Sequence, residues 1–426
     1  MLRALSKQSA PPVVFGLFVT LITLSAIPLA KADALDLAQA GFAAKQRRDC
    51  VQAIQLFSEA IRQGNFDSER RGFLVYSRGV CYEGMGISDK ALSDFDTAIA
   101  LLPNFPNSYI YRGLIWTFER EYDRAIDDFL SARRLSPRDP MIFNNLAGAY
   151  ERKGDLDRAI ENYDEAVRLQ PSYAEAYYNR AAAFLTKGDL QRALSDYDQA
   201  ISLQPTFADA IGNRGAVHLM LGNFEKAIAD FGAAIRLRPG DASFWANRAN
   251  ANLTVRNFTA ALADFDQALQ LAPGDPAYYL GRGRARLFAG DNTASVEDFK
   301  TAVRLRPSNP YAMIWLHIAR VHGGENDRAE LTENAAKVRR DMWPAPMLEY
   351  YLDAVDSGQV QAASRIGSGQ DQAKRACEAE FFLSESIVHA GQVDQARERL
   401  KSVVAGCKLY DVVYSAALAE LNLLSK

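Results

Sequence analysis

AEAYYNRAAAFLTKGDLQRALSDYDQAISLQP, residues 174–205, is one copy of a unit that recurs along this 426-residue chain. Within it, a small residue, an aromatic residue, a second small residue and a proline stand at Ala193, Tyr197, Ala200 and Pro205. A fixed period is typical of a repeat array, in which each unit buries its apolar side against the next. The period is 34 residues, and the other copies of the marker are Ala91, Phe95, Ala98, Pro103; Ala125, Phe129, Ala132, Pro137; Ala159, Tyr163, Ala166, Pro171; Ala227, Phe231, Ala234, Pro239; Ala261, Phe265, Ala268, Pro273; and Ser295, Phe299, Ala302, Pro307.

Each period is predicted to form two helices joined by a turn. Apolar and small residues recur at helical spacing, and a short triplet such as Lys187-Gly188-Asp189 interrupts that spacing once. We expect the aromatic marker to wedge between helices that approach closely at the small residues, and the proline to end the second helix. The small position of the first helix is occupied by Gly79, Gly113, Ala147, Ala181, Gly215, Ala249 and Gly283.

This arrangement resembles the tetratricopeptide repeat (TPR), whose pattern places small residues, an aromatic residue and a proline in this order. The resemblance implies an all-α fold, a right-handed α-α superhelical solenoid of helix hairpins, over residues 33–340. About nine repeats are expected there, with a first, capping repeat around Phe57 and a degenerate ninth repeat that begins at Pro310 and has Glu333 in place of the aromatic marker.

The ends of the chain differ from the array. Residues 1–32 are predicted to be a cleaved signal peptide, because Arg3 and Lys7 precede an apolar run and Ala30-Lys31-Ala32 is a small-residue cleavage site. The alternative is an uncleaved membrane anchor. Cleavage would move the formal charge from −3 to −6, because Arg3, Lys7 and Lys31 are lost, so no nucleic-acid partner is expected.

Beyond the array, residues 341–376 are predicted to be an irregular helical linker and residues 377–426 a TPR-like hairpin with a capping helix. The stretches WPAPMLEYYL, CEAEFFLSESIVHAGQVDQARERLKSVVAGC and YSAALAELNLL resemble the C-terminal part of new-lipoprotein-I type TPR adaptors of the bacterial envelope. This resemblance covers about 80 residues, and the chain departs from that family in having no lipid-bearing cysteine after its leader.

Four cysteines suit an oxidising compartment after export. Cys50 and Cys81 belong to neighbouring antiparallel helices of the first two repeats, while Cys377 opens the last hairpin and Cys407 ends it. Two disulfides, Cys50–Cys81 and Cys377–Cys407, are therefore predicted, each contributing about 2–4 kcal/mol at an end of the array. The alternative is four unrelated buried thiols.

Two charged positions vary together among the repeats. Wherever the seventh position of the first helix is arginine, the residue before the aromatic marker is aspartate, and the fourth repeat has lost both, with Leu146 and Asn162 instead. This coupling predicts bidentate, partly buried structural ion pairs. They are Arg78 with Asp94, Arg112 with Asp128, Arg180 with Asp196, Arg214 with Asp230, Arg248 with Asp264, and Arg282 with Asp298.

The sequence contains no recognisable catalytic or metal-binding pattern. None of the four histidines stands in a ligand pattern, and Asp pairs such as Asp94 and Asp96 recur with the repeat, whereas a catalytic pair is needed once. No enzymatic activity, metal or cofactor is therefore expected. The alternative is a solute-binding or catalytic role built around the degenerate segment 343–369.

A helix-hairpin solenoid exposes a long concave surface, lined by its first helices, that suits an extended peptide or a partner helix. The function expected from this resemblance is a protein-protein interaction scaffold or adaptor of the cell envelope, periplasmic, with membrane contact only if the leader is retained. Ala246 stands where a chaperone-tail clamp would need lysine beside Asn250, so a chaperone-tail receptor is disfavoured. The residues expected to line the groove are Tyr76, Phe118, Asn144, Arg152, Tyr178, Asn250, Arg284 and Phe288, together with Leu185, Leu219 and Met220.

Overall fold

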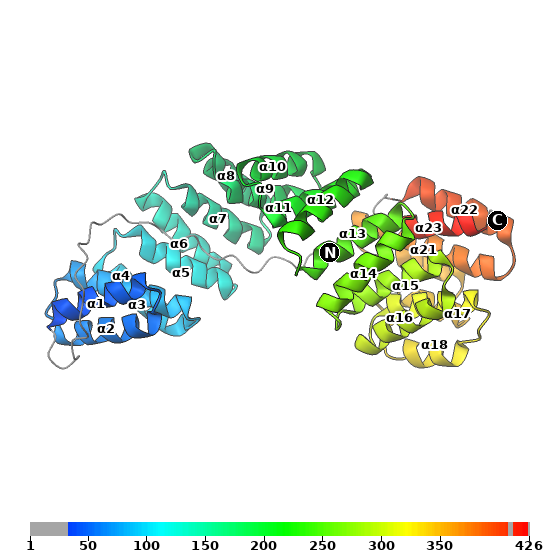
Figure 1. Ribbon diagram of the computed structural model, residues 1–426, viewed down its shortest axis with the longest axis horizontal. Coiled ribbons are helices and arrows are strands. Elements are labelled where there is room, and N and C mark those ends of the chain that lie inside the picture. Colours follow the sequence, from blue (N-terminus) through cyan, green and yellow to red (C-terminus); the bar gives the residue numbers. More distant parts are fainter. Residues whose placement is uncertain (1–32, 408–411, 425–426) are drawn as a thin grey trace. The chain divides into compact units, whose positions relative to one another are not determined.

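The computed structural model describes residues 33–407 and 412–424, and the predicted signal peptide lies outside these ranges. Every regular element in the described ranges is a helix. The chain divides into two compact units, one ending at Pro137 and the other beginning at Arg138 (Figure 1). The boundary falls inside the repeat array, between the third and fourth repeats, where the sequence period continues without a break.

The first unit contains three helix pairs, in which each helix contacts the next along the chain. Its helices are α1 (Ala34–Gln46), α2 (Cys50–Gln63), α3 (Ser68–Gly84), α4 (Ser88–Leu101), α5 (Pro106–Phe118) and α6 (Tyr122–Leu135).

The second unit continues the pairs and then departs from them. Six pairs stack in chain order, and five more helices follow. The pairs are α7 (Pro140–Lys153), α8 (Leu156–Leu169), α9 (Ala174–Lys187), α10 (Leu190–Leu203), α11 (Ala208–Met220), α12 (Phe224–Leu237), α13 (Ala242–Thr254), α14 (Phe258–Leu271), α15 (Pro276–Ala289), α16 (Asn292–Leu305), α17 (Pro310–His322) and α18 (Arg328–Ala335). The helices after them are α19 (Ala345–Tyr351), α20 (Ser357–Ser364), α21 (Gly369–His389), α22 (Val393–Gly406) and α23 (Val412–Leu423). The predicted all-α class and the stacking of helix pairs are confirmed within each unit.

The turn inside each pair requires one residue in the left-handed region. Gly188, at φ 82°, ends α9, and the side chain of Asp189 then accepts a hydrogen bond from the backbone N–H of Arg192 to cap α10. Arg120 and Arg256 occupy the same place in other repeats with φ of 64° and 62°, so there the turn forms without glycine.

The aromatic markers lie in the centre of the pairs, as predicted. All eight, counting Phe57, are almost completely buried. Space for the ring comes from the small position of the first helix, since a Cβ added to Gly113 would lie 2.8 Å from the ring of Phe129. The ring and the small residue are therefore complementary in shape, which explains why both recur with the same period.

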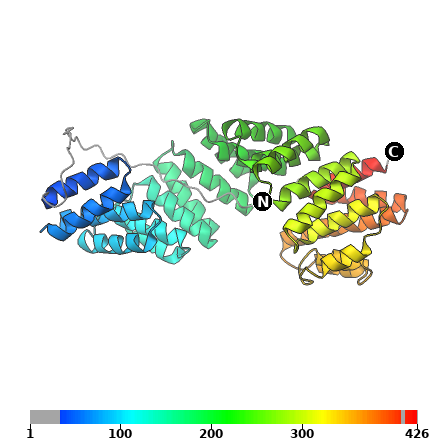
Figure 2. The ribbon, with the colours of Figure 1, turned by 60° about the horizontal axis from the view of Figure 1, so that its bottom comes forward.

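The helices after the array fold back onto its last repeats. α21 contacts α17, and α23 contacts α15 (Figure 2). α21 begins at Gly369, so residues 369–376 of the predicted linker belong to this helix. The degenerate ninth repeat is visible as the short helix α18, which has eight residues instead of the usual fourteen.

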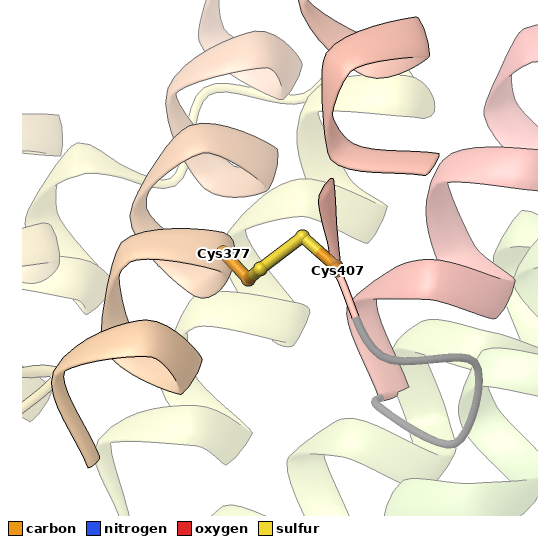
Figure 3. The surroundings of a disulfide bond; sticks show 2 residues. All are labelled: Cys377 and Cys407. Atoms are coloured by element: carbon orange, nitrogen blue, oxygen red, sulfur yellow. A yellow bond between two sulfur atoms is a disulfide. The ribbon is translucent and has the colours of Figure 1, made fainter. Parts of the chain in front are cut away.

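One of the two predicted disulfides is present. Cys377 in α21 bonds Cys407 after α22, with a Cα–Cα distance of 5.8 Å (Figure 3). Cys50 and Cys81 are free thiols, which corrects the prediction of a second bridge. They are neighbours, as the register predicted, but burial and the hydrogen bond with Cys50 raise the pKa of Cys81 to about 12, which favours the protonated thiol over the thiolate that oxidation needs.

In the described ranges, no helix is both long enough and apolar enough to cross a bilayer.

Candidate interaction surface

The six arginine–aspartate pairs that the sequence predicts are all formed. In each, Nε and Nη2 of the arginine donate to the two carboxylate oxygens of the aspartate, at distances between 2.6 and 3.0 Å. The aspartates are buried, whereas 16–25 % of each arginine side chain is exposed. Burial raises the pKa of Asp128, and the bonds from Arg112 oppose that shift.

A second aspartate, which the pairing pattern did not reveal, links neighbouring repeats. Nη1 of Arg214 donates to Asp198, which follows the aromatic marker of the preceding repeat, at 2.8 Å. Each such arginine therefore bonds one aspartate in its own repeat and one in the repeat before. The recurring Asp-aromatic-Asp sequence is the signal that could have predicted this bridge. The other bridges are Arg112 to Asp96, Arg180 to Asp164 and Arg282 to Asp266.

The bridge is missing where the sixth repeat meets the seventh, because Gly232 stands in place of the second aspartate. A Cβ added to Gly232 would lie 3.5 Å from Nη1 of Arg248, an ordinary contact distance. Gly232→Asp should therefore raise the free energy of unfolding by about 0.5–1 kcal/mol, from higher helix propensity and a partly exposed ion pair.

The matched control for this change is Gly232→Asn, which has a similar helix propensity but no charge. Denaturant melts of both variants at low and high salt separate the two contributions. Equal stability of the two variants at low salt would contradict the ion pair, and the excess stability of Gly232→Asp should shrink as salt is added.

The predicted groove residues of the first unit lie on its first helices. Phe118, the last residue of α5, is 81 % exposed. Tyr76 in α3 is half-buried, with its ring in edge contact with Phe105 and Tyr111. Phe118 is thus an aromatic side chain available to a partner, whereas Tyr76 is mainly part of the packing.

Polar side chains connect successive first helices of the second unit. Nδ2 of Asn179 in α9 donates to Oδ1 of Asn144 in α7 at 3.0 Å, and Nδ2 of Asn213 in α11 donates to the hydroxyl of Tyr178 at 3.2 Å. Asn144 is half-buried, Arg152 at the end of α7 is exposed, and Tyr178 is buried at 8 % exposure. We call the side of the unit formed by α7, α9, α11 and α13 the first-helix face.

The polar side chains of the first helices continue with Asn250 in α13 and Arg284 in α15, but α23 packs against α15. Nη2 of Arg284 donates to Oδ1 of Asn250 at 3.4 Å, and burial lowers the pKa of Arg284 to about 10. Phe288 is buried in the same apolar cluster as Val413 and Ala416 of α23. Arg284 and Phe288 therefore lie inside the protein, and the first-helix face ends at Asn250. Of the other lining residues, Leu219 is buried, and Leu185 and Met220 are half-buried.

Side chains of segment 343–369 are held by packing against α21. Nε1 of Trp343 donates to Glu378 at 2.6 Å, and the hydroxyl of Tyr351 donates to the carbonyl of Phe382 at 2.9 Å. Two open hollows, each of about 510 Å³, lie elsewhere, at the hairpin turns around Gly154 and Gly188. The polar atoms of Trp343 and Tyr351 thus have structural partners.

Comparisons with known proteins agree with the repeat register. Families described as "TPR repeat" and "Tetratricopeptide repeat" match residues 149–188, 174–207, 196–229, 213–276 and 280–344. The comparison with curated proteins finds no match.

Several solved structures are similar to part of the chain. YrrB, described as a TPR protein with an unusual peptide-binding site, is 20 % identical, with 43 % of this chain and 95 % of YrrB covered and a TM-score of 0.39. PilF of Pseudomonas aeruginosa is 19 % identical, with 49 % and 94 % covered and a TM-score of 0.44. The C-terminal part of a TPR repeat-containing protein from Cytophaga hutchinsonii is 20 % identical, with 57 % and 99 % covered and a TM-score of 0.46. The repeat register, the buried aromatic wedges and the family matches together show that this chain is built from tetratricopeptide repeats, which the family models match between residues 149 and 344.

Proposed function

We propose that this protein is a scaffold of the bacterial cell envelope that binds a peptide or a partner protein along its first helices. TPR proteins in general mediate protein-protein interactions and are not enzymes. The observation that carries the proposal is the row of first helices α7, α9, α11 and α13, on which the amide side chains of Asn144, Asn213 and Asn250 are half-buried and so remain partly accessible. Such side chains can hydrogen-bond the main chain of an extended peptide.

The two units, each taken by itself, offer different kinds of contact. Asn144 and Asn250 are half-buried amides, each able to donate and to accept, and Arg152 adds an exposed cation. Phe118 in the first unit supplies an exposed aromatic ring, the type of group that contributes most of the energy at interfaces. Arg284, Phe288 and Tyr178 of the second unit are not among these contacts, because they are buried.

The test is capture of partners by the chain from Asp33 onward, compared between variants. Phe118→Ala and the pair Asn144→Ala with Arg152→Ala should weaken binding of a specific partner, by about 10- to 100-fold for a residue that acts as an anchor. Ile366→Ala is the matched control, because Ile366 is 67 % exposed but lies outside the repeats. A partner held equally by all variants would place the interface on the second helices or the C-terminal helices.

The envelope location rests on separate observations. The predicted leader and the Cys377–Cys407 disulfide both suit an exported protein, and the C-terminal helices resemble those of new-lipoprotein-I type adaptors. N-terminal sequencing of the protein from its native cells should find Asp33 first. An N-terminus at Met1 would instead indicate a retained anchor or a protein that is not exported.

A further inference from the structure

Three ionisable side chains from three helices meet where the tail folds back onto the ninth repeat. His322 ends α17, Glu385 lies in α21 and Glu420 lies in α23. One nitrogen of His322 and one oxygen of each glutamate lie within 4.8 Å of one another. Nε2 of His322 is 3.1 Å from Oε2 of Glu385.

The two carboxylates lack the partners that buried acids usually have. Glu385 is 5 % exposed and Glu420 is 2 % exposed. Oε1 of Glu385 and Oε2 of Glu420 have no hydrogen-bond partner in the described part of the chain. An acid that is buried without a counter-charge is costly, so the protein either keeps a proton there or holds a cation.

The charges of the three side chains act on one another. Burial and the neighbouring Glu385 raise the pKa of Glu420 to about 8, and His322 opposes the shift. Burial disfavours the charged form of His322, but the hydrogen bond and the charge of Glu385 outweigh it and raise the pKa of the imidazole. The imidazole of His322 is therefore the one basic group of the cluster, and it lies beside two carboxyl groups.

We propose that His322, Glu385 and Glu420 form a zinc site that joins the ninth repeat to the C-terminal helices. Zinc binds imidazole nitrogen and carboxylate oxygen in sites with few ligands, and three protein ligands leave a fourth position for water. Calcium and magnesium prefer more oxygen ligands and no imidazole. The His322 side chain is 19 % exposed, which gives an ion a path from solvent.

The disulfide restrains the helix that carries Glu385. Glu385 lies eight residues after Cys377 on α21, and the Cys377–Cys407 disulfide connects that helix to the end of α22, just before α23. The disulfide restrains α21 and the end of α22, and the site would add a link from α17 to α21 and α23. That link would stabilise α23, which lies in the same apolar cluster as Phe288. This role does not depend on partner binding at the first-helix face.

The test is zinc titration by calorimetry of the chain from Asp33 onward, with Cys50 and Cys81 changed to alanine so that free thiols cannot bind the metal. We expect one zinc per chain and a rise in Tm that a chelator reverses. Glu420→Gln and Glu385→Gln should each weaken zinc binding by at least about 100-fold, more than the loss of a group that only orients a ligand.

The control is Glu378→Gln, because Glu378 is also a buried glutamate of α21 but is hydrogen-bonded by Tyr311 and Trp343. It should leave zinc affinity unchanged. Without zinc, Glu420→Gln should keep or raise the Tm, because it replaces a buried carboxyl group that lacks a hydrogen-bond partner at one oxygen, and far-UV circular dichroism verifies that it folds. Absence of stoichiometric zinc binding overturns the proposal, and so does binding that Glu420→Gln leaves unchanged or that Glu378→Gln weakens equally.

Discussion

Replacing Phe231 with alanine should lower the free energy of unfolding of the second unit by about 3–5 kcal/mol. The ring is 1 % exposed and packs against Leu219, Ala227 and Ala251. Gly215 leaves the space that the ring fills, since its added Cβ would lie 3.1 Å from the ring. The cavity would open between α11 and α12, and neighbouring repeats could close it only by shifting their backbones.

Phe118→Ala is the matched control, because it removes the same ring at a position that is 81 % exposed. It should change stability by less than about 0.5 kcal/mol. Guanidinium melts followed by circular dichroism and by fluorescence give the comparison, and disagreement between the two probes would reveal partial unfolding of the array. Similar losses for the two variants would contradict the assignment of Phe231 as a wedge.

Arg214→Ala should cost about 3 kcal/mol, nearly as much as the loss of the ring, because it leaves the carboxylate of Asp230 buried without a partner. Asp230 is 8 % exposed and receives two bonds from Arg214, of 2.6 and 2.8 Å. The third bond of Arg214, to Asp198, adds less, since 57 % of the Asp198 side chain is exposed. Hydrogen exchange of the α11 and α12 amides measures the local effect.

Asp198→Asn separates the two roles of Arg214. It breaks the bridge to the preceding repeat but keeps the pair within the repeat, so it should cost less than about 1 kcal/mol. Arg214→Lys keeps the charge without the planar fork and should fall between the two. If Arg214→Ala were no more destabilising than Asp198→Asn, the pair within the repeat would not be an important source of stability.

Local periodicity was enough to predict the fold of the repeats. The contacts of the small residues, the aromatic marker and the proline lie within one helix pair or between adjacent pairs. The sequence of each repeat is therefore enough to predict its helix hairpin and its packing on the next repeat. The coupled loss of Arg and Asp in the fourth repeat predicted the internal ion pair for the same reason. The second aspartate was missed, although Asp96 and its equivalents stand beside the marker, because its partner belongs to the next period.

Contacts between distant segments decided the rest. Arg284 and Phe288 occupy groove positions of their repeat, yet they are buried, because α23, more than 120 residues later, returns to α15. His322, Glu385 and Glu420 come from helices with no shared period, so no spacing along the chain could bring them together before the fold did. The sequence by itself determined the repeats, since their packing is between neighbours in the chain. Only the tertiary structure decided which first helices keep an exposed face and which glutamates lie beside His322. Both depend on how the non-repeating C-terminal helices pack onto the repeats.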